Sequence, residues 1–129
     1  MQEDEIGKEV VDAAIAVHRA LGPGLLETVY EAVLTRELQQ RELKVERQVP
    51  IAIAYRGLHF EEGFRADMVV EGKVILELKS VEAVSRVHKK QLLTYLRLTG
   101  LKLGLLLNFG EALMKDGITR LVHRLDERR

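Results

Sequence analysis

Two acidic residues and one lysine stand in stretches of the chain that are otherwise apolar. Residues 73–80 have the alternation of a strand in which Glu77 and Lys79 share one face, while the apolar residues that alternate with them share the other. Asp67 lies in a second apolar stretch, residues 64–70. Because an unpaired buried charge is too costly to keep, charged side chains in such places indicate a bound metal ion or an ion pair.

A tight turn at Glu71-Gly72 is expected to join these two stretches into a hairpin. The hairpin brings Asp67 close to Glu77 on a common face. Two carboxylates at that distance repel each other, and a divalent cation is the usual solution. The alternative is structural, with Lys79 bridging both acids in a buried ion pair.

A third acidic candidate lies on a helix predicted from Leu26 to Leu38. A step of about 100° per residue places Glu27 in the apolar sector of this helix and Glu31 at its margin. Glu37 falls in the same sector, so the argument is not unique to Glu27. The alternative for Glu27 is a carboxylate at the flank of the helix, held in an ion pair.

A further helix, predicted from about Glu82 to Thr99, carries polar side chains within an amphipathic pattern. Gln91 and Tyr95 are one turn apart, so both can reach one ligand. They share a sector with His88, interpreted as a helix-face residue rather than a ligand, and with the apolar residues Val84, Val87 and Leu98.

The same helix carries a separate basic ridge formed by Arg86, Lys90 and Arg97. The chain as a whole has 20 basic and 20 acidic residues, which argues against binding nucleic acid through overall charge. Residues 85–110, however, contain five Lys or Arg and no acidic residue. This ridge is a candidate site for backbone phosphates; the alternative is a solvated helix face.

The periodicity of the apolar residues predicts the elements that position these side chains. Helices are expected over residues 3–21, 26–38 and 82–99, and Gly22-Pro23-Gly24 separates the first two. Strands are expected over residues 49–55, 64–70, 73–80, 101–109 and 117–125. Pro50 makes the first strand an edge strand, and the Arg128-Arg129 end is expected to fray. The prediction is one α/β (α+β) domain over residues 1–129, with the order ααβββαβ and a C-terminal extra strand.

Composition excludes several classes of protein. A chain of 129 residues fits one domain, and the absence of Cys rules out disulfides and Cys-ligated metal sites. No apolar run has the length of a membrane span, and the start of the chain, with acidic residues at positions 3–5, lacks the positive charge of a signal peptide. We therefore expect a cytoplasmic protein without a membrane partner.

Four short motifs resemble those of a known family. Residues 24–30, Gly-Leu-Leu-Glu-Thr-Val-Tyr, match the GxxExxY signature that names a group of small proteins. Asp67 followed by Glu77-Leu78-Lys79 resembles the D…ExK arrangement of the PD-(D/E)XK nuclease superfamily, in which that group is placed. Gln91 to Tyr95 resembles the QxxxY motif of its recombination-type exonucleases. The departures are Ala66, which stands where the pattern has Pro, and the lack of the Cys ligands of the iron–sulfur branch.

The resemblance implies a restriction-endonuclease-like core, αβββαβ, with a central mixed sheet flanked by helices. It also implies a nuclease that hydrolyses phosphodiester bonds, with DNA as the expected substrate. Asp67 and Glu77 would hold Mg²⁺ or Mn²⁺ together with the Leu78 carbonyl, and Glu27 would add a ligand directly or through water. Lys79 would position or deprotonate the attacking water.

By the same resemblance, Gln91 and Tyr95 would orient the DNA end or the lysine amine. Two other functions remain open from the sequence. The first is a catalytically silent nuclease fold that binds nucleic acid or protein within a larger complex, and a homodimer through the first helix would enlarge its binding surface. The second is a protein-interaction domain whose buried charges are structural.

Overall fold

The computed structural model describes residues 1–125. Two helices come first, α1 (Glu3–Leu21) and α2 (Glu27–Gln40). Three strands follow, β1 (Val45–Tyr55), β2 (Leu58–Val70) and β3 (Val74–Lys79). The chain then continues through α3 (Arg86–Thr99), β4 (Leu103–Asn108), a 3₁₀ turn (Met114–Gly117) and β5 (Ile118–Val122). The predicted order of helices and strands is confirmed. The Arg128-Arg129 end lies outside the described residues.

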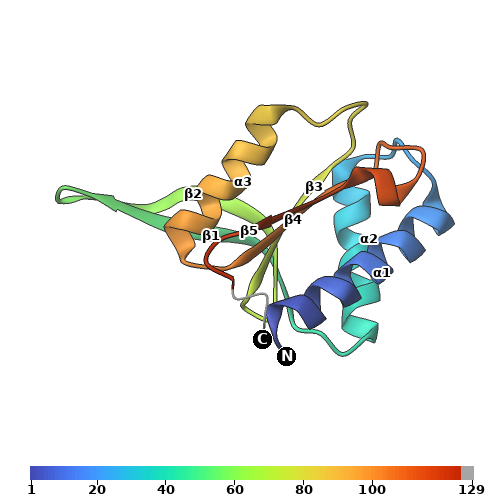
Figure 1. Cartoon of the computed structure of the whole chain (residues 1–129), viewed down its shortest axis with the longest axis horizontal. Helices are drawn as coiled ribbons and strands as arrows, with labels where there is room; N and C mark the ends of the chain where they lie inside the picture. Colours follow the sequence, from blue (N-terminus) through green and yellow to red (C-terminus); the bar gives the residue numbers. More distant parts are fainter. Residues whose placement is uncertain (126–129) are drawn as a thin grey trace.

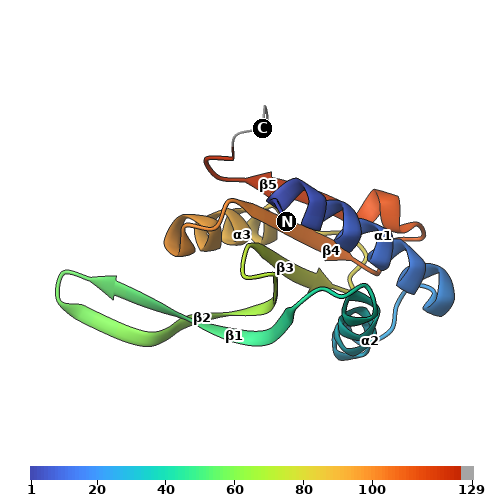
Figure 2. The ribbon, with the colours of Figure 1, turned by 90° about the horizontal axis from the view of Figure 1, so that it is seen from below.

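The five strands form one mixed sheet in the order β1-β2-β3-β4-β5. All neighbours are antiparallel except β3 and β4, which are parallel because α3 connects them as a crossover helix. The prediction that the first strand is an edge strand is confirmed. Figures 1 and 2 show α1 and α2 on one face of the sheet and α3 on the other.

Each face of the sheet has its own apolar cluster. Beneath α1 and α2, the cluster includes Ile6, Val10, Leu34, Leu76 and Phe109, all without exposed surface. The apolar face of α1, considered as a dimer contact, is therefore occupied by the core. Beneath α3, a smaller cluster includes Ala66, Ile75, Leu92, Leu96 and Leu106. Strand β3 supplies residues to both clusters, so the catalytic candidates on it lie at the centre of the domain.

Hairpin β1–β2 extends past the rest of the sheet as an arm (Figure 2). Strand β2 pairs with β3 only over Met68–Val70, whereas β1 and β2 stay paired out to the turn at Arg56-Gly57. Both turn residues have positive φ, 45° and 85°, as a two-residue hairpin turn requires. At Gly63 a Cβ would lie 2.0 Å from the Ile53 side chain, so only glycine fits at this irregularity of the hairpin.

Helix α3 differs from its predicted form in two respects. It begins at Arg86 rather than near Glu82, because Ser85 caps it with its side chain and the preceding loop is tied to β4. Asn108, at the end of β4, bonds both the N–H and the carbonyl of Val81. The sector that Val87 and Leu98 share with Tyr95 is also not the buried face of α3. The buried face is formed by Leu92 and Leu96, while Val87 and Leu98 are exposed.

The remaining differences concern strand ends. Strand β2 begins earlier than predicted, at Leu58, because its first residues form the exposed arm and carry no apolar pattern of a buried strand. Strand β1 also begins earlier, at Val45, where it pairs with the end of β2. Strand β5 ends at Val122, three residues before the predicted end. In the described part of the chain, no helix has the length and apolar character needed to cross a membrane.

Candidate active site

The predicted carboxylate pair lies where β2 diverges from β3. The Leu78 N–H donates to Asp67 Oδ2 at 2.8 Å, and the Asp67 N–H donates to Glu77 Oε1 at 3.3 Å. These side-chain acceptors replace the backbone partners that a continuing ladder would have supplied. The predicted proximity of Asp67 and Glu77 is therefore confirmed, and both carboxylates are partly buried in the fork between the strands.

The carboxylate pair is electrostatically unfavourable without a cation. Burial, followed by the charge of Asp67, raises the pKa of Glu77 to about 8. Burial also raises the pKa of Asp67, and the negative charge of Glu31 adds to this effect. At neutral pH the pair therefore retains a proton when no cation is bound. A divalent cation would remove both the repulsion and the proton.

Lys79 follows Glu77 on the same face of β3 and is partly buried. Its positive charge acts to lower the pKa of both Asp67 and Glu77. Among the ion pairs of residues 1–125, however, none joins Lys79 to either acid. The structural alternative, a buried ion pair that bridges both acids, is thus not formed, and the amine remains available at the carboxylate pair.

The chemistry of the donor groups fits Mg²⁺ or Mn²⁺. The available ligands are the carboxylates of Asp67 and Glu77 and the backbone carbonyl of Leu78, all of them oxygens. Within residues 1–125, no three acidic or histidine side chains converge closely enough to form a metal cage by themselves. Mg²⁺ does not need such a cage, because it usually keeps several water ligands and takes only one or two carboxylates from the protein.

The prediction for α2 was wrong in its choice of the buried acid. Glu27 is exposed, because α2 begins at this residue and its first turn extends beyond the core. Glu31, one turn later, is only 8% exposed. Both residues line a pocket together with Thr28, Gln48, Asp67 and Leu78. Glu27 therefore lies at the rim of the site, and Glu31 is the acid that α2 buries beside Asp67.

Helix α3 brings Tyr95 to the other side of the carboxylate pair. The Tyr95 ring stacks on Phe64 of β2, with a centroid distance of 3.9 Å and an interplanar angle of 3°. Partial burial raises the pKa of the Tyr95 hydroxyl, and the charges of Glu77 and Asp67 raise it further. The hydroxyl thus remains a hydrogen-bond donor at neutral pH. Gln91, one turn earlier, is exposed.

The predicted basic ridge is a solvent-exposed feature of α3. Its members make no ion pair with any residue of the described chain, and the Arg97 guanidinium only donates to the Thr94 hydroxyl at 3.3 Å. His88 accepts from the Ser85 N–H through Nδ1, which fits its interpretation as a helix-face residue. Arg86, Lys90 and Arg97 are all exposed and can meet phosphates.

The tyrosine of the GxxExxY signature, Tyr30, stabilises the fold rather than lining the site. Tyr30 is fully buried and stacks on Phe109 at a centroid distance of 4.3 Å. Its hydroxyl donates to the Gly22 carbonyl and accepts from the Leu25 N–H. These bonds hold the turn between α1 and α2, and so set the place where α2 begins beside the carboxylate pair.

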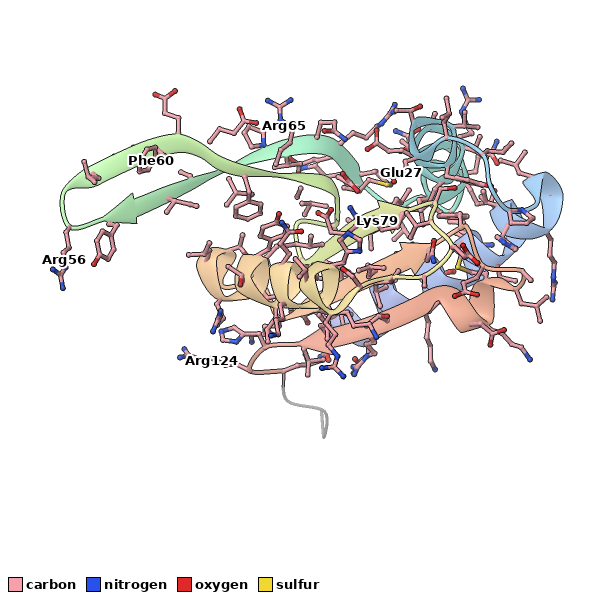
Figure 3. The ribbon with its side chains drawn as sticks, turned by 90° about the horizontal axis from the view of Figure 1, so that it is seen from above. Glu27, Arg56, Phe60, Arg65, Lys79 and Arg124 are labelled. Atoms are coloured by element: carbon pink, nitrogen blue, oxygen red, sulfur yellow. The ribbon has the colours of Figure 1, made fainter. Side chains whose placement is uncertain are left out.

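The sequence reasoning missed one residue that lines the pocket and the neighbour that pairs with Glu31. Gln48 lines the pocket, and its neighbour Arg47 pairs with Glu31. Arg47 and Gln48 come close to Asp67 only because β1 pairs with β2. The local pattern of apolar residues does not predict this pairing. Figure 3 shows Glu27 and Lys79 near the base of the arm, while Arg56 and Phe60 lie farther along it.

Comparison with known proteins supports this assembly. A family model described as the PD-(D/E)XK nuclease superfamily matches residues 4–121, from α1 into β5. No curated protein and no solved structure matches the chain significantly. The mixed sheet with helices on both faces confirms the predicted restriction-endonuclease-like core. Since the match covers most of the residues, the carboxylate pair and ExK strand included, the chain belongs to the PD-(D/E)XK nuclease superfamily.

Proposed function

We propose that the protein is a metal-dependent nuclease of the GxxExxY group that hydrolyses phosphodiester bonds in DNA. One observation carries this proposal. Asp67 and Glu77 accept hydrogen bonds from each other's strands at the fork of β2 and β3, with Lys79 next on the same face. This arrangement supplies oxygen ligands for a cation and an amine beside it, and both can assist hydrolysis of a phosphodiester.

Asp67, Glu77 and the Leu78 carbonyl would hold Mg²⁺ or Mn²⁺, and Glu27 at the rim would reach it through water. The ion, when bound, supplies positive charge for the phosphoryl oxygens and a more acidic water. Lys79, held on the β3 strand, would position the attacking water and, in its neutral form, accept a proton from it. The Tyr95 hydroxyl would donate a hydrogen bond to a substrate oxygen or accept one from the Lys79 side chain.

The basic ridge on α3 is the proposed contact for the DNA backbone. Arg86, Lys90 and Arg97 lie on the helix that also carries Tyr95, so phosphate contacts there would fix the substrate relative to the carboxylates. Gln91 is exposed on this helix and would contact the DNA end. Binding through these residues would weaken as the salt concentration rises, because the release of counterions from the DNA on binding then becomes less favourable.

The test is cleavage of end-labelled DNA and RNA, single- and double-stranded, in Mg²⁺, Mn²⁺ or EDTA. We expect wild type to cleave DNA with either ion, and Glu77→Gln and Lys79→Met to lose at least about a hundredfold in rate. Glu61→Gln, on the exposed arm, is the matched control and should cleave like wild type. Cleavage that persists in EDTA, or undiminished cleavage by Glu77→Gln, would overturn the proposal.

A further inference from the structure

Gln48 has a backbone conformation that is unusual for its place in the fold. It lies inside β1, yet its φ is 50°, in the left-handed region that residues other than glycine rarely adopt. The strand pairing continues on both sides, with Arg47 opposite Met68 and Val49 opposite Ala66. Gln48 therefore stands opposite Asp67, and such local strain is often retained at functional sites.

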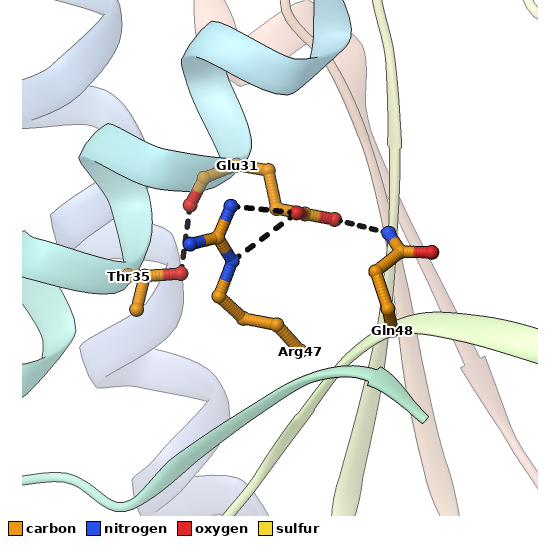
Figure 4. A network of polar contacts seen from close by, with 4 residues as sticks. All are labelled: Glu31, Thr35, Arg47 and Gln48. Carbon is orange, nitrogen blue, oxygen red and sulfur yellow. Dashed lines mark hydrogen bonds and ion pairs between the residues drawn. The ribbon is translucent and has the colours of Figure 1, made fainter. Parts of the chain in front are cut away.

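The left-handed backbone changes where the side chains point. In a regular strand, adjacent side chains lie on opposite faces of the sheet. Here Arg47 and Gln48 both reach the carboxylate of Glu31 on α2 (Figure 4). Gln48 Nε2 donates to Glu31 Oε1 at 2.6 Å, and Arg47 Nη2 and Nε donate to Glu31 Oε2 at 2.9 and 3.2 Å.

Glu31 is a well-fixed anchor for these two side chains. Its side chain is only 10% exposed, and it forms an ion pair with Arg47. Its backbone carbonyl also accepts from the Thr35 hydroxyl at 2.7 Å. Since both carboxylate oxygens already accept hydrogen bonds, Glu31 is better suited to orient Gln48 than to bind a cation itself.

Within residues 1–125, only the nitrogen of the Gln48 side-chain amide is held by a hydrogen bond. Its nitrogen is used by Glu31, and its oxygen accepts no hydrogen bond from the described protein residues. Figure 4 shows this oxygen directed away from Glu31. Gln48 lines the same pocket as Asp67 and Leu78. Water molecules bound to a divalent cation are strong donors, and a neutral amide oxygen is a suitable acceptor for them.

We propose that Gln48 is a positioning residue of the carboxylate site, whose amide oxygen accepts a hydrogen bond from a water ligand of the cation at Asp67. The Arg47–Glu31 ion pair fixes the direction of the amide. This inference rests on the proposed metal-dependent function. It assigns to β1, an edge strand with no residue of the superfamily motifs, a role in holding the hydrated ion.

The test is Mn²⁺ binding measured by calorimetry in the absence of nucleic acid. Gln48→Ala should weaken Mn²⁺ binding about tenfold, as expected for the loss of an outer hydrogen-bond partner. Gln48→Gly should weaken it equally while its melting temperature stays at or above that of Gln48→Ala, because glycine adopts the left-handed backbone without strain. Gln39→Ala, an exposed glutamine of α2, is the matched control and should bind Mn²⁺ like wild type.

A double-mutant cycle tests whether Glu31 acts through Gln48. Glu31→Gln should weaken Mn²⁺ binding severalfold in wild type but have little further effect in Gln48→Ala. An equal effect in both backgrounds would overturn the role of Glu31 as an anchor for Gln48. If both Gln48 variants bind Mn²⁺ like wild type, the inference is wrong while the proposed function stands. If wild type neither binds Mn²⁺ nor cleaves DNA, both fall.

Discussion

Asp67 and Glu77 each accept a hydrogen bond from the backbone of the other's strand. The Leu78 N–H donates to Asp67 Oδ2, and the Asp67 N–H donates to Glu77 Oε1. The carboxylates therefore serve the fold and the site at once, because they end the β2–β3 ladder with satisfied N–H groups and face each other at the place where it ends. The site is pre-formed by backbone pairing rather than by mobile loops.

The stability of the metal-free protein should fall as the pH rises. The pKa of Glu77 is raised from its usual value to about 8, so the folded state binds its proton more tightly than the unfolded state does. The free energy of unfolding should then decrease between about pH 5 and pH 8, by at most about 5 kcal/mol. Urea unfolding in EDTA at several pH values measures this change.

Glu77→Gln should remove most of that pH dependence, since its amide has no proton to lose. The variant should match wild type near pH 5 and be the more stable protein at pH 8. Glu61→Gln, exposed on the arm, serves as the control and should follow the wild-type curve. Parallel curves for wild type and Glu77→Gln would contradict the raised pKa.

Mn²⁺ binding at pH 7 should release protons. The carboxylate pair retains a proton without a cation, because burial raises the pKa of both Asp67 and Glu77, and the charge of Asp67 raises the pKa of Glu77 further. A cation binds only the ionised carboxylates, so close to one proton should leave per ion bound. Calorimetric titrations in buffers of different ionisation enthalpy measure this number. Release that is absent at pH 7 and unchanged at pH 9 would contradict the prediction.

Tyr95→Phe should reduce DNA cleavage without reducing stability, because it removes the hydroxyl and keeps the ring. The phenyl ring keeps the stack on Phe64, so the free energy of unfolding should stay within about 0.5 kcal/mol of wild type. Loss of the hydroxyl donor should reduce DNA cleavage about tenfold or more. Phe64→Ala removes the stack instead and should lower the free energy of unfolding by about 1–2 kcal/mol. Tyr55→Phe, at the tip of the arm, is the control for both measurements.

Asn108→Ala should destabilise the loop between β3 and α3. The Asn108 side chain accepts from the N–H groups of Val81 and Gly110 and donates to the Val81 carbonyl. Loss of these bonds should cost about 2–4 kcal/mol of the free energy of unfolding. Gly110→Ala should disturb the same contact between Asn108 and Val81, because the new Cβ would lie 2.1 Å from the Val81 oxygen. The two substitutions should therefore be less than additive, and additive effects would contradict the shared contact.

The sequence was sufficient to predict the carboxylate pair because the hairpin that joins Asp67 to Glu77 is local. A short turn and a period of two determine which residues of adjacent strands meet. The strand and helix order followed from periodicity for the same reason. Lys79 needed no further information, since it lies two residues after Glu77 on the same strand.

Features that depend on tertiary packing were not predictable in this way. A helical projection gives the angle of Glu27 and Glu31 but not the residue at which α2 enters the core, so the exposed acid was chosen. On α3, the projection grouped Val87 and Leu98 with Tyr95, and only contact with the sheet shows that Leu92 and Leu96 form the buried face. Gln48 depends on a backbone torsion and on strand register, which no residue type specifies.

The arm also offers a point at which the chain can be divided. The bond between Arg56 and Gly57 lies at the hairpin turn, remote from both apolar clusters (Figure 3). Division there leaves Glu31 and Gln48 on one polypeptide and the Asp67–Glu77 pair on the other. Neither fragment carries the whole pocket, and the β1–β2 ladder is the surface through which they would recombine. The fold thus provides a division of the pocket between two fragments, so that a complete pocket would report on the encounter of the two halves.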